Sequence, residues 1–302
     1  MALNELVPEP ARPISATITE VHTGPATDPL AWLATTPHTD ERWYWEVPED
    51  DTAWVGMGSA ATVSTSGPGR FDEAAREADQ LLSGLRVTGP PDAPLPRLAA
   101  GFAFDDTAQS GPWEPFGDGR LVLPAVQVLR RGGRTWVIRI DGHDRPTPVM
   151  VAPDPAGPIE VDAADWADEA SRAHYRHLVE LALEAIERGE LVKAVPCRSL
   201  RLERRPDVAR LLATLRSTYP ACATVGVSIG TTSFVAATPE RLVAVAGDRL
   251  HTAALAGSAP RHADPAIDAA LGQGLLTSPK ERSEHAVVVD AIDRSLQRLG
   301  VV

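Results

Sequence analysis

The sequence has few cysteines, and Cys197 and Cys222 are the only two among 302 residues. Two thiols cannot build a disulfide framework or a four-ligand zinc site, and the eight histidines add no metal-ligand spacing. The sequence also lacks a run of about 18 apolar residues, so it predicts no transmembrane helix. Its first residues show no basic flank before an apolar run, and therefore no secretory signal. We expect a cytoplasmic protein with no membrane partner.

Positive charge is in deficit, with 29 Lys and Arg against 41 Asp and Glu and a net charge of −12. A nucleic-acid surface needs clustered cations, so we expect no nucleic-acid partner. The hydrophobic content of 43% and the charged content of 23% are those of an ordinary globular chain, long enough for one large domain or two smaller ones. Nucleophile-elbow, Walker and dinucleotide motifs are absent.

Proline is abundant, with 27 residues, and clusters at 89–97 and 145–158. The first stretch predicts a hairpin over 41–58, because apolar and polar residues alternate around an acidic turn. It also predicts a helix over 70–85, a buried strand over 97–105, and two strands over 121–140 joined by Gly-Gly.

From about residue 163 the pattern changes, which divides the chain into regions 1–162 and 163–302. The second region predicts a helix over 169–189, a strand over 191–203 and a three-stranded meander over 222–255. Two helices follow, and the second begins at Ser278 and Glu281 with a capping box.

Three side chains are candidates for chemistry. Lys193 lies on a predicted strand, and a lysine desolvated on an apolar face loses its proton more readily and can act as a base. Glu240 follows a strand end, where a carboxyl group can donate a proton. Glu284 lies in the capped helix, where a carboxylate can bind Mg²⁺. Taken singly, each is better explained as an edge or surface charge.

A fourth candidate is the turn at Gly257 and Ser258. A glycine with adjacent backbone donors can cradle an anion, although most Gly-Ser pairs are only turns.

Four blocks in this order and spacing change the interpretation: GELVKAVPCR, FVAATPERLV, TAALAGSAPR and LLTSPKERSEHAVVVDAI. Together they resemble the chorismate-utilising enzymes, which include isochorismate, salicylate, anthranilate and aminodeoxychorismate synthases. The earlier blocks WYWE, GFAFDD, PWEPFGD and LVLP resemble the isochorismate synthase subgroup. The resemblance implies an α+β fold of the chorismate-binding, aminodeoxychorismate synthase-like type, a two-sheet sandwich with outer helices.

The resemblance also implies roles. A lysine at the position of Lys193 is similar to the water-using branch, whereas the ammonia-using branches carry Gln there, so no glutamine amidotransferase subunit is expected. Lys193 would activate water to attack carbon 2 of chorismate, and Glu240 would protonate the hydroxyl that leaves carbon 4. Gly257 and Ser258 match the substrate-contacting turn, and Glu284 matches a ligand of the Mg²⁺ cofactor. The product would supply menaquinone or siderophore synthesis.

The sequence departs from the family pattern at Pro196, where Leu is usual, and at Ala253, where Glu is common. The family blocks that carry a second Mg²⁺ carboxylate and the substrate-binding Arg and Tyr do not occur. We therefore expect a fold that is incomplete at the C-terminus and a chain that is inactive by itself. The alternatives are a salicylate synthase, which also eliminates pyruvate, or a non-catalytic fragment or subunit of the family.

Overall fold

The computed structural model describes residues 14–22, 27–37, 40–105, 109–140, 168–199 and 206–300. The chain forms two compact units, one of residues 1–158 with 206–239 and the other of residues 159–205 with 240–302. Both units are discontinuous in sequence, since residues 206–239 belong to the first. The division of the sequence into regions 1–162 and 163–302 stays a prediction.

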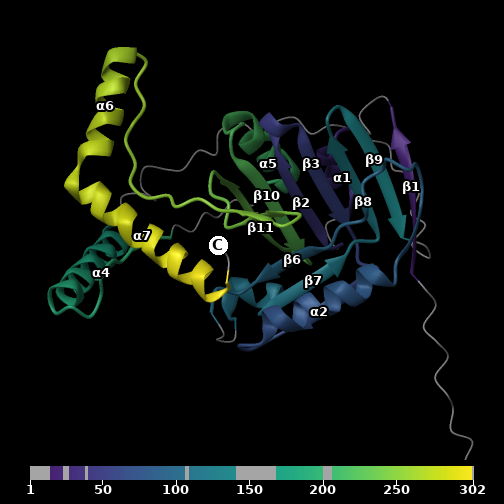
Figure 1. Ribbon diagram of the computed structural model, residues 1–302, viewed down its shortest axis with the longest axis horizontal. Helices are drawn as coiled ribbons and strands as arrows, with labels where there is room; N and C mark the ends of the chain where they lie inside the picture. The colour runs from purple at the N-terminus through teal and green to yellow at the C-terminus, as the bar shows by residue number, and fades with distance from the viewer. Residues whose placement is uncertain are drawn as a thin grey trace, which may run out of the picture. The chain divides into compact units, whose positions relative to one another are not determined.

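The first unit contains an eight-stranded sheet in the order β11-β10-β2-β3-β8-β9-β1-β5 (Figure 1). Its strands are β1 Ser15–Val21, β2 Arg42–Val47, β3 Thr52–Met57, β5 Arg86–Thr88, β8 Val126–Arg131, β9 Arg134–Ile140, β10 Ala223–Ile229 and β11 Thr232–Thr238. The pairings are antiparallel except that β1 and β5 run parallel. Antiparallel pairing suits short connections of the kind that join β2 to β3.

A second sheet of three strands has the order β4-β7-β6. Its strands are β4 Ala61–Thr65, β6 Ala99–Phe102 and β7 Gly119–Leu123, and the helical segments of this unit are α1 Pro29–Thr35, η2 Pro48–Asp50, α2 Arg70–Ser83, η3 Gly111–Phe116 and α5 Val208–Thr218. Helix α2 packs on the small sheet, and α1 and α5 pack on the large one (Figure 1). The unit is thus a two-sheet sandwich with outer helices, which confirms the predicted α+β fold class.

Strand β2 shows how the sequence produces these layers. Successive side chains point to opposite faces of a strand. Tyr44 therefore joins the core under α1 and α5, which includes Leu212 and Val55, while Trp43 joins the core between the two sheets with Val122. The alternation that predicts the hairpin over 41–58 thus builds two cores, and the hairpin is confirmed.

The region 121–140 contains three strands rather than the predicted two. Pro124 ends β7, because proline lacks the N–H that a sheet interior needs. The turn between β8 and β9 is confirmed at Gly132 and Gly133, whose φ values of 57° and 73° suit glycine. The strand predicted over 97–105 is confirmed as β6, but Ala99 is its only buried residue.

The second unit contains α4 Glu169–Glu187, α6 Pro265–Thr277, α7 Pro279–Arg298 and a hairpin of β12 Ala244–Ala246 and β13 Arg249–His251. Asp168, Asp264 and Ser278 cap the three helices by accepting hydrogen bonds from backbone N–H groups of the first turn. The Ser278 contact, from the N–H of Glu281 at 3.4 Å, confirms the oxygen-to-backbone half of the predicted capping box.

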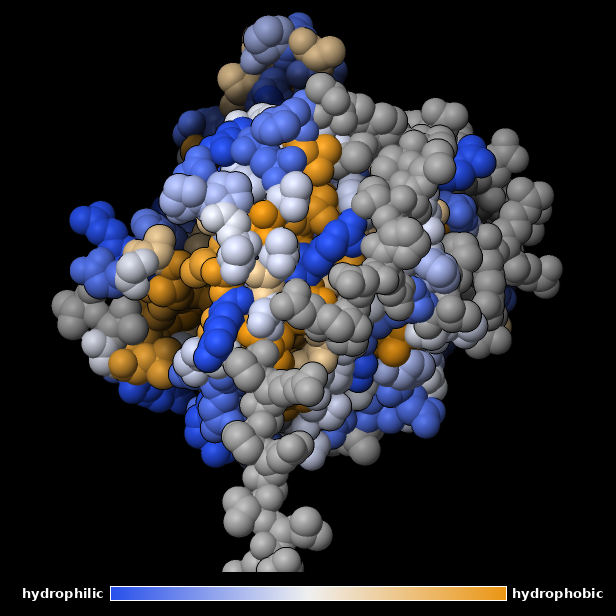
Figure 2. All heavy atoms as spheres, turned by 90° about the vertical axis from the view of Figure 1, so that its right-hand side faces the viewer, coloured by the Kyte–Doolittle hydropathy of each residue, from blue (hydrophilic) through white to orange (hydrophobic). Residues whose placement is uncertain are grey.

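No described residue of the second unit is buried, in contrast to the first unit. Large apolar side chains such as Val192, Leu242 and Leu276 are exposed. On the side of the first unit that bears β1, hydrophobic residues are likewise visible between hydrophilic ones (Figure 2). In the described ranges no helix is both long enough and apolar enough to cross a membrane. The described part of the second unit therefore has no hydrophobic core of its own.

Two strand predictions are wrong. Residues 191–199 form no strand, and residues 200–205 lie outside the described residues. Pro196 removes a ladder N–H in the middle of this segment, which disfavours a strand. The predicted three-stranded meander is instead two hairpins in separate sheets, because the chain leaves β11 at Pro239 and starts a new pair at β12.

Candidate functional site

All five predicted site residues belong to the second unit. Lys193 is half-buried in a segment without regular secondary structure, and Glu240 is exposed just after Pro239. Gly257 and Ser258 lie in the irregular segment after β13, and both are exposed. Glu284 is half-buried in the second turn of α7.

A hydrogen bond connects the segment of Glu240 to the segment that precedes the turn. Thr252 Oγ1 donates to the carbonyl oxygen of Leu242 at 2.8 Å. The β12–β13 hairpin continues this contact, because Ala244 pairs with His251. The chain just after Glu240 therefore runs beside the chain that leads to Gly257.

The turn itself is held against helix α7. Nε2 of His285 donates to the carbonyl oxygen of Ala254 at 3.2 Å. Gly257 has φ +79°, a left-handed conformation that favours glycine, and a Cβ at this position would lie 2.4 Å from Oε2 of Glu281 and 3.3 Å from Leu275. The backbone conformation therefore favours glycine, and the carboxylate end of the flexible Glu281 side chain packs against it.

The structure thereby connects three of the predicted segments, those of Glu240, of Gly257 with Ser258, and of Glu284. Lys193 belongs to the same unit, and its distance from Glu240 across a substrate-sized gap stays a prediction. Sequence reasoning assigned no role to the contacts of His285 and Glu281 with the turn. The four-residue spacing of Glu281 and His285 could have indicated these contacts, because residues four apart lie on the same face of a helix.

The donor set for a metal is small. Within the described ranges no group of three His, Cys, Asp or Glu side chains could hold a metal ion. Mg²⁺, however, is commonly held through one or two carboxylates, with water and substrate oxygens completing its octahedron. The half-buried carboxylate of Glu284 fits this chemistry, and it is the one predicted ligand in the described chain.

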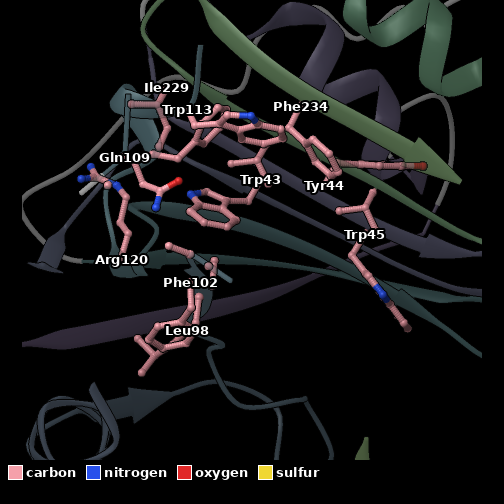
Figure 3. Close-up of a pocket in the computed structure, with 18 of the residues that line it drawn as sticks. Trp43, Tyr44, Trp45, Leu98, Phe102, Gln109, Trp113, Arg120, Ile229 and Phe234 are labelled. Carbon is pink, nitrogen blue, oxygen red and sulfur yellow. The ribbon is translucent and has the colours of Figure 1, made fainter. Parts of the chain in front are cut away.

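The first unit contains a separate cavity of about 750 Å³ between its two sheets (Figure 3). Many of its lining residues are aromatic: Trp43, Tyr44, Trp45, Trp54, Phe102, Phe104, Trp113, Phe116 and Phe234. In Figure 3 Gln109 and Arg120 lie toward the same end of the cavity as the indole of Trp43. Arg120 forms a bidentate contact with Glu41 at 2.8 and 2.6 Å, which raises the pKa of its guanidinium. None of the predicted site residues lines this cavity.

The sandwich and the connected segments together define an α+β fold that is known from solved enzymes. The chain superimposes on MenF, the menaquinone-specific isochorismate synthase from Escherichia coli, with a TM-score of 0.65 and 22% identity over 94% of this chain and 64% of MenF. Residues 40–302 match the family model described as chorismate binding enzyme, so the chain belongs to this family.

Curated relatives include several activities. The salicylate biosynthesis isochorismate synthase of Pseudomonas aeruginosa PAO1 is 30% identical over 280 residues, which cover 86% of this chain and 57% of that protein. An anthranilate synthase component 1 of Halobacterium salinarum is 35% identical over 149 residues, 49% of this chain and 28% of that protein. The chain thus spans less than two thirds of the length of these relatives and of MenF.

Proposed function

We propose that the polypeptide containing this chain is an isochorismate synthase, which adds water to carbon 2 of chorismate with loss of the carbon 4 hydroxyl. The observation that carries the proposal is Lys193 in the block GELVKAVPCR. The ammonia-using branches of the family have a similar block, but they carry Gln at the position of Lys193. Ammonia is itself the nucleophile and needs no base, whereas water must lose a proton as it attacks. The similarity to two isochorismate synthases over most of the chain supports the same reaction.

In this mechanism Lys193 in its neutral form takes a proton from the attacking water. Glu240 in its protonated form gives a proton to the departing hydroxyl. Positioned acids and bases of this kind each contribute about 10²–10⁴ in rate. The two steps are balanced, because the substrate gains one hydroxyl and loses another while one proton moves onto the enzyme and one moves off.

The turn at Gly257 and Ser258 would bind a substrate carboxylate through backbone N–H groups and the serine hydroxyl. Glu284 would hold Mg²⁺, which when bound supplies positive charge opposite a substrate carboxylate. A chain of net charge −12 otherwise repels a dianionic substrate, so this charge matters for binding. The connections from Leu242 to Thr252 and from Ala254 to His285 support a shared site for these segments.

A second candidate is a non-catalytic member or subunit of the family. The observation that favours it is the absence of any buried residue in the described part of the second unit. Catalytic groups must be held within about 0.5 Å of their productive positions by well-packed neighbouring side chains. A unit without buried residues does not provide such neighbours. We therefore propose that the 302 residues by themselves do not turn over chorismate.

The test is a product assay on two samples, this chain and the longest polypeptide of its coding region that contains it. Each is incubated with chorismate and Mg²⁺, with and without ammonium, and isochorismate, salicylate, pyruvate and anthranilate are separated by chromatography. Isochorismate alone supports the proposal. Salicylate with pyruvate supports the salicylate synthase alternative, anthranilate refutes the branch assignment, and no product from either sample supports the non-catalytic candidate.

Lys193→Gln in the active sample should lower isochorismate formation by about 10²–10⁴-fold, while chorismate still binds, because the variant removes the base and leaves the remaining contacts. Arg176→Gln is a matched control, since it removes an exposed cation from α4 in the same unit. An unchanged rate in Lys193→Gln would show that another group accepts the proton.

A further inference from the structure

His285 follows Glu284 on α7 and is exposed. Its Nε2 lies 3.2 Å from the carbonyl oxygen of Ala254. A carbonyl oxygen only accepts hydrogen bonds, so Nε2 must carry the proton that forms this contact. The imidazole is therefore fixed in one tautomer, or doubly protonated, and its ring joins α7 to a chain segment 31 residues earlier.

The segment that His285 contacts also lies beside Leu275 of α6 at Gly257. Residues 254–258 form no helix or strand, and none of them is buried. Their second contact with α7 is Glu281, whose carboxylate packs against Gly257. Glu281 and His285 are four residues apart, so both project from one face of the helix. The segment is attached to that face at Ala254 and at Gly257.

These contacts also set the position of the turn relative to Glu284. A hydrogen bond from the neighbouring residue limits how far the segment can move from the Glu284 carboxylate. A turn that binds an anion must keep its N–H groups at a fixed distance from the other groups that hold the same substrate. None of residues 254–258 is buried, so this position depends on contacts such as those with His285, Glu281 and Leu275.

We propose that His285 is a positioning residue, which holds the 254–258 turn on α7 next to Glu284 by donating its Nε2 proton to Ala254. The assignment of the turn to substrate binding rests on the proposed function. The hydrogen bond and its effect on the position of the turn are independent of that function. His285 does not itself exchange a proton with the substrate in this role.

The first experiment uses the 302-residue chain without substrate. The carbonyl ¹³C shift of Ala254, the ¹⁵N shifts of the His285 ring and amide hydrogen exchange over 252–258 are measured by NMR. His285→Ala should move the Ala254 carbonyl shift toward an unbonded value and speed exchange in the turn by about threefold to tenfold, as expected for one lost hydrogen bond. His285→Gln should retain most of both, because its amide N–H can reach the same carbonyl.

His174→Ala is the matched control, since His174 is an exposed histidine on α4 of the same unit. Circular dichroism of each variant checks that the helices remain. The proposal is overturned if His285→Ala leaves the Ala254 shift and the exchange of the turn unchanged. It is also overturned if His174→Ala changes them equally, or if the wild-type ring shows Nε2 without a proton.

The second experiment uses whichever sample turns over chorismate. His285→Ala should raise KM for chorismate by about threefold to tenfold with a smaller change in kcat, and His285→Gln should restore it. A lost carbonyl contact with an unchanged KM would overturn the role in substrate positioning. If no sample has activity, the proposed function fails, and the NMR result still decides whether His285 holds the turn.

Discussion

Glu46 is the centre of a buried charged network in the first unit, and its removal should destabilise the protein strongly. The residue is 1% exposed on β2. Its Oε1 accepts from Nη2 of Arg130 at 2.7 Å, and its Oε2 accepts from the hydroxyl of Tyr44. Arg216 approaches Oε2 to 3.8 Å and forms a bidentate contact with Asp28 at 3.0 and 2.9 Å. The network thus joins β2 and β8 to α5 and to the residue that caps α1.

The cost follows from what is left behind. Glu46→Ala leaves the buried Tyr44 without an acceptor, and it leaves Arg130, whose side chain is 22% exposed, with only Asp51 at 3.1 Å and Asp28 at 3.9 Å. Breaking a buried ion pair by removing one partner costs about 3–5 kcal/mol. Glu46→Gln keeps an oxygen for Arg130 but removes the charge, which corresponds to about 1.5–3 kcal/mol for a charged hydrogen bond. Since whole proteins are stable by about 5–15 kcal/mol, the Ala variant should be marginal.

The assay is urea unfolding of the two variants and wild type, followed by tryptophan fluorescence because Trp43, Trp45 and Trp54 lie in the same sheet. Glu169→Ala is the control, since Glu169 pairs with Arg176 at the surface and such pairs contribute about 0–1 kcal/mol. The expected order of destabilisation is Glu46→Ala, then Glu46→Gln, then Glu169→Ala. If Glu46→Ala cost no more than the control, the network would not stabilise the fold.

Two further predictions concern the same sandwich. Burial, and then the Glu46 carboxylate, raise the pKa of Tyr44 well above its ordinary value of 10.0, so the folded state binds this proton more tightly than the unfolded state does. The stability that Tyr44 contributes is therefore complete below about pH 10 and falls as the pH rises above it. The urea midpoint of wild type should thus decrease between pH 8 and pH 11, and that of Tyr44→Phe should decrease less. Gly56→Ala would place a Cβ 2.5 Å from Cγ of Pro124, which belongs to a rigid ring. The variant should therefore lose about 1–3 kcal/mol of stability, measured by thermal unfolding. An unchanged unfolding midpoint would show that β3 and the Pro124 segment move apart easily.

The sequence alone determined the elements whose signals are local. The hairpin over 41–58 follows from alternation around an acidic turn, the turn at Gly132 and Gly133 follows from glycine chemistry, and the start of α7 follows from Ser278 and Glu281. Each of these signals acts over a few residues, within one strand pair or one helix turn, so distant parts of the chain do not alter it.

The family, and with it the two-sheet fold, was also readable from the sequence, because four blocks in fixed order carry it. The candidate residues came from those blocks rather than from their own surroundings. Lys193, Glu240 and Glu284 are individually better explained as surface charges, and no local pattern distinguishes a catalytic carboxylate from a solvated one.

Only the tertiary structure decided how distant segments meet. It assigned residues 206–239 to the first unit, separated β12 and β13 from β11, and left residues 191–199 without a strand. It also brought Trp43 and Phe234 to one cavity and His285 to Ala254. The physical reason is that such contacts depend on loop closure and on which apolar faces cover one another, and both are properties of the whole chain rather than of a short window of sequence.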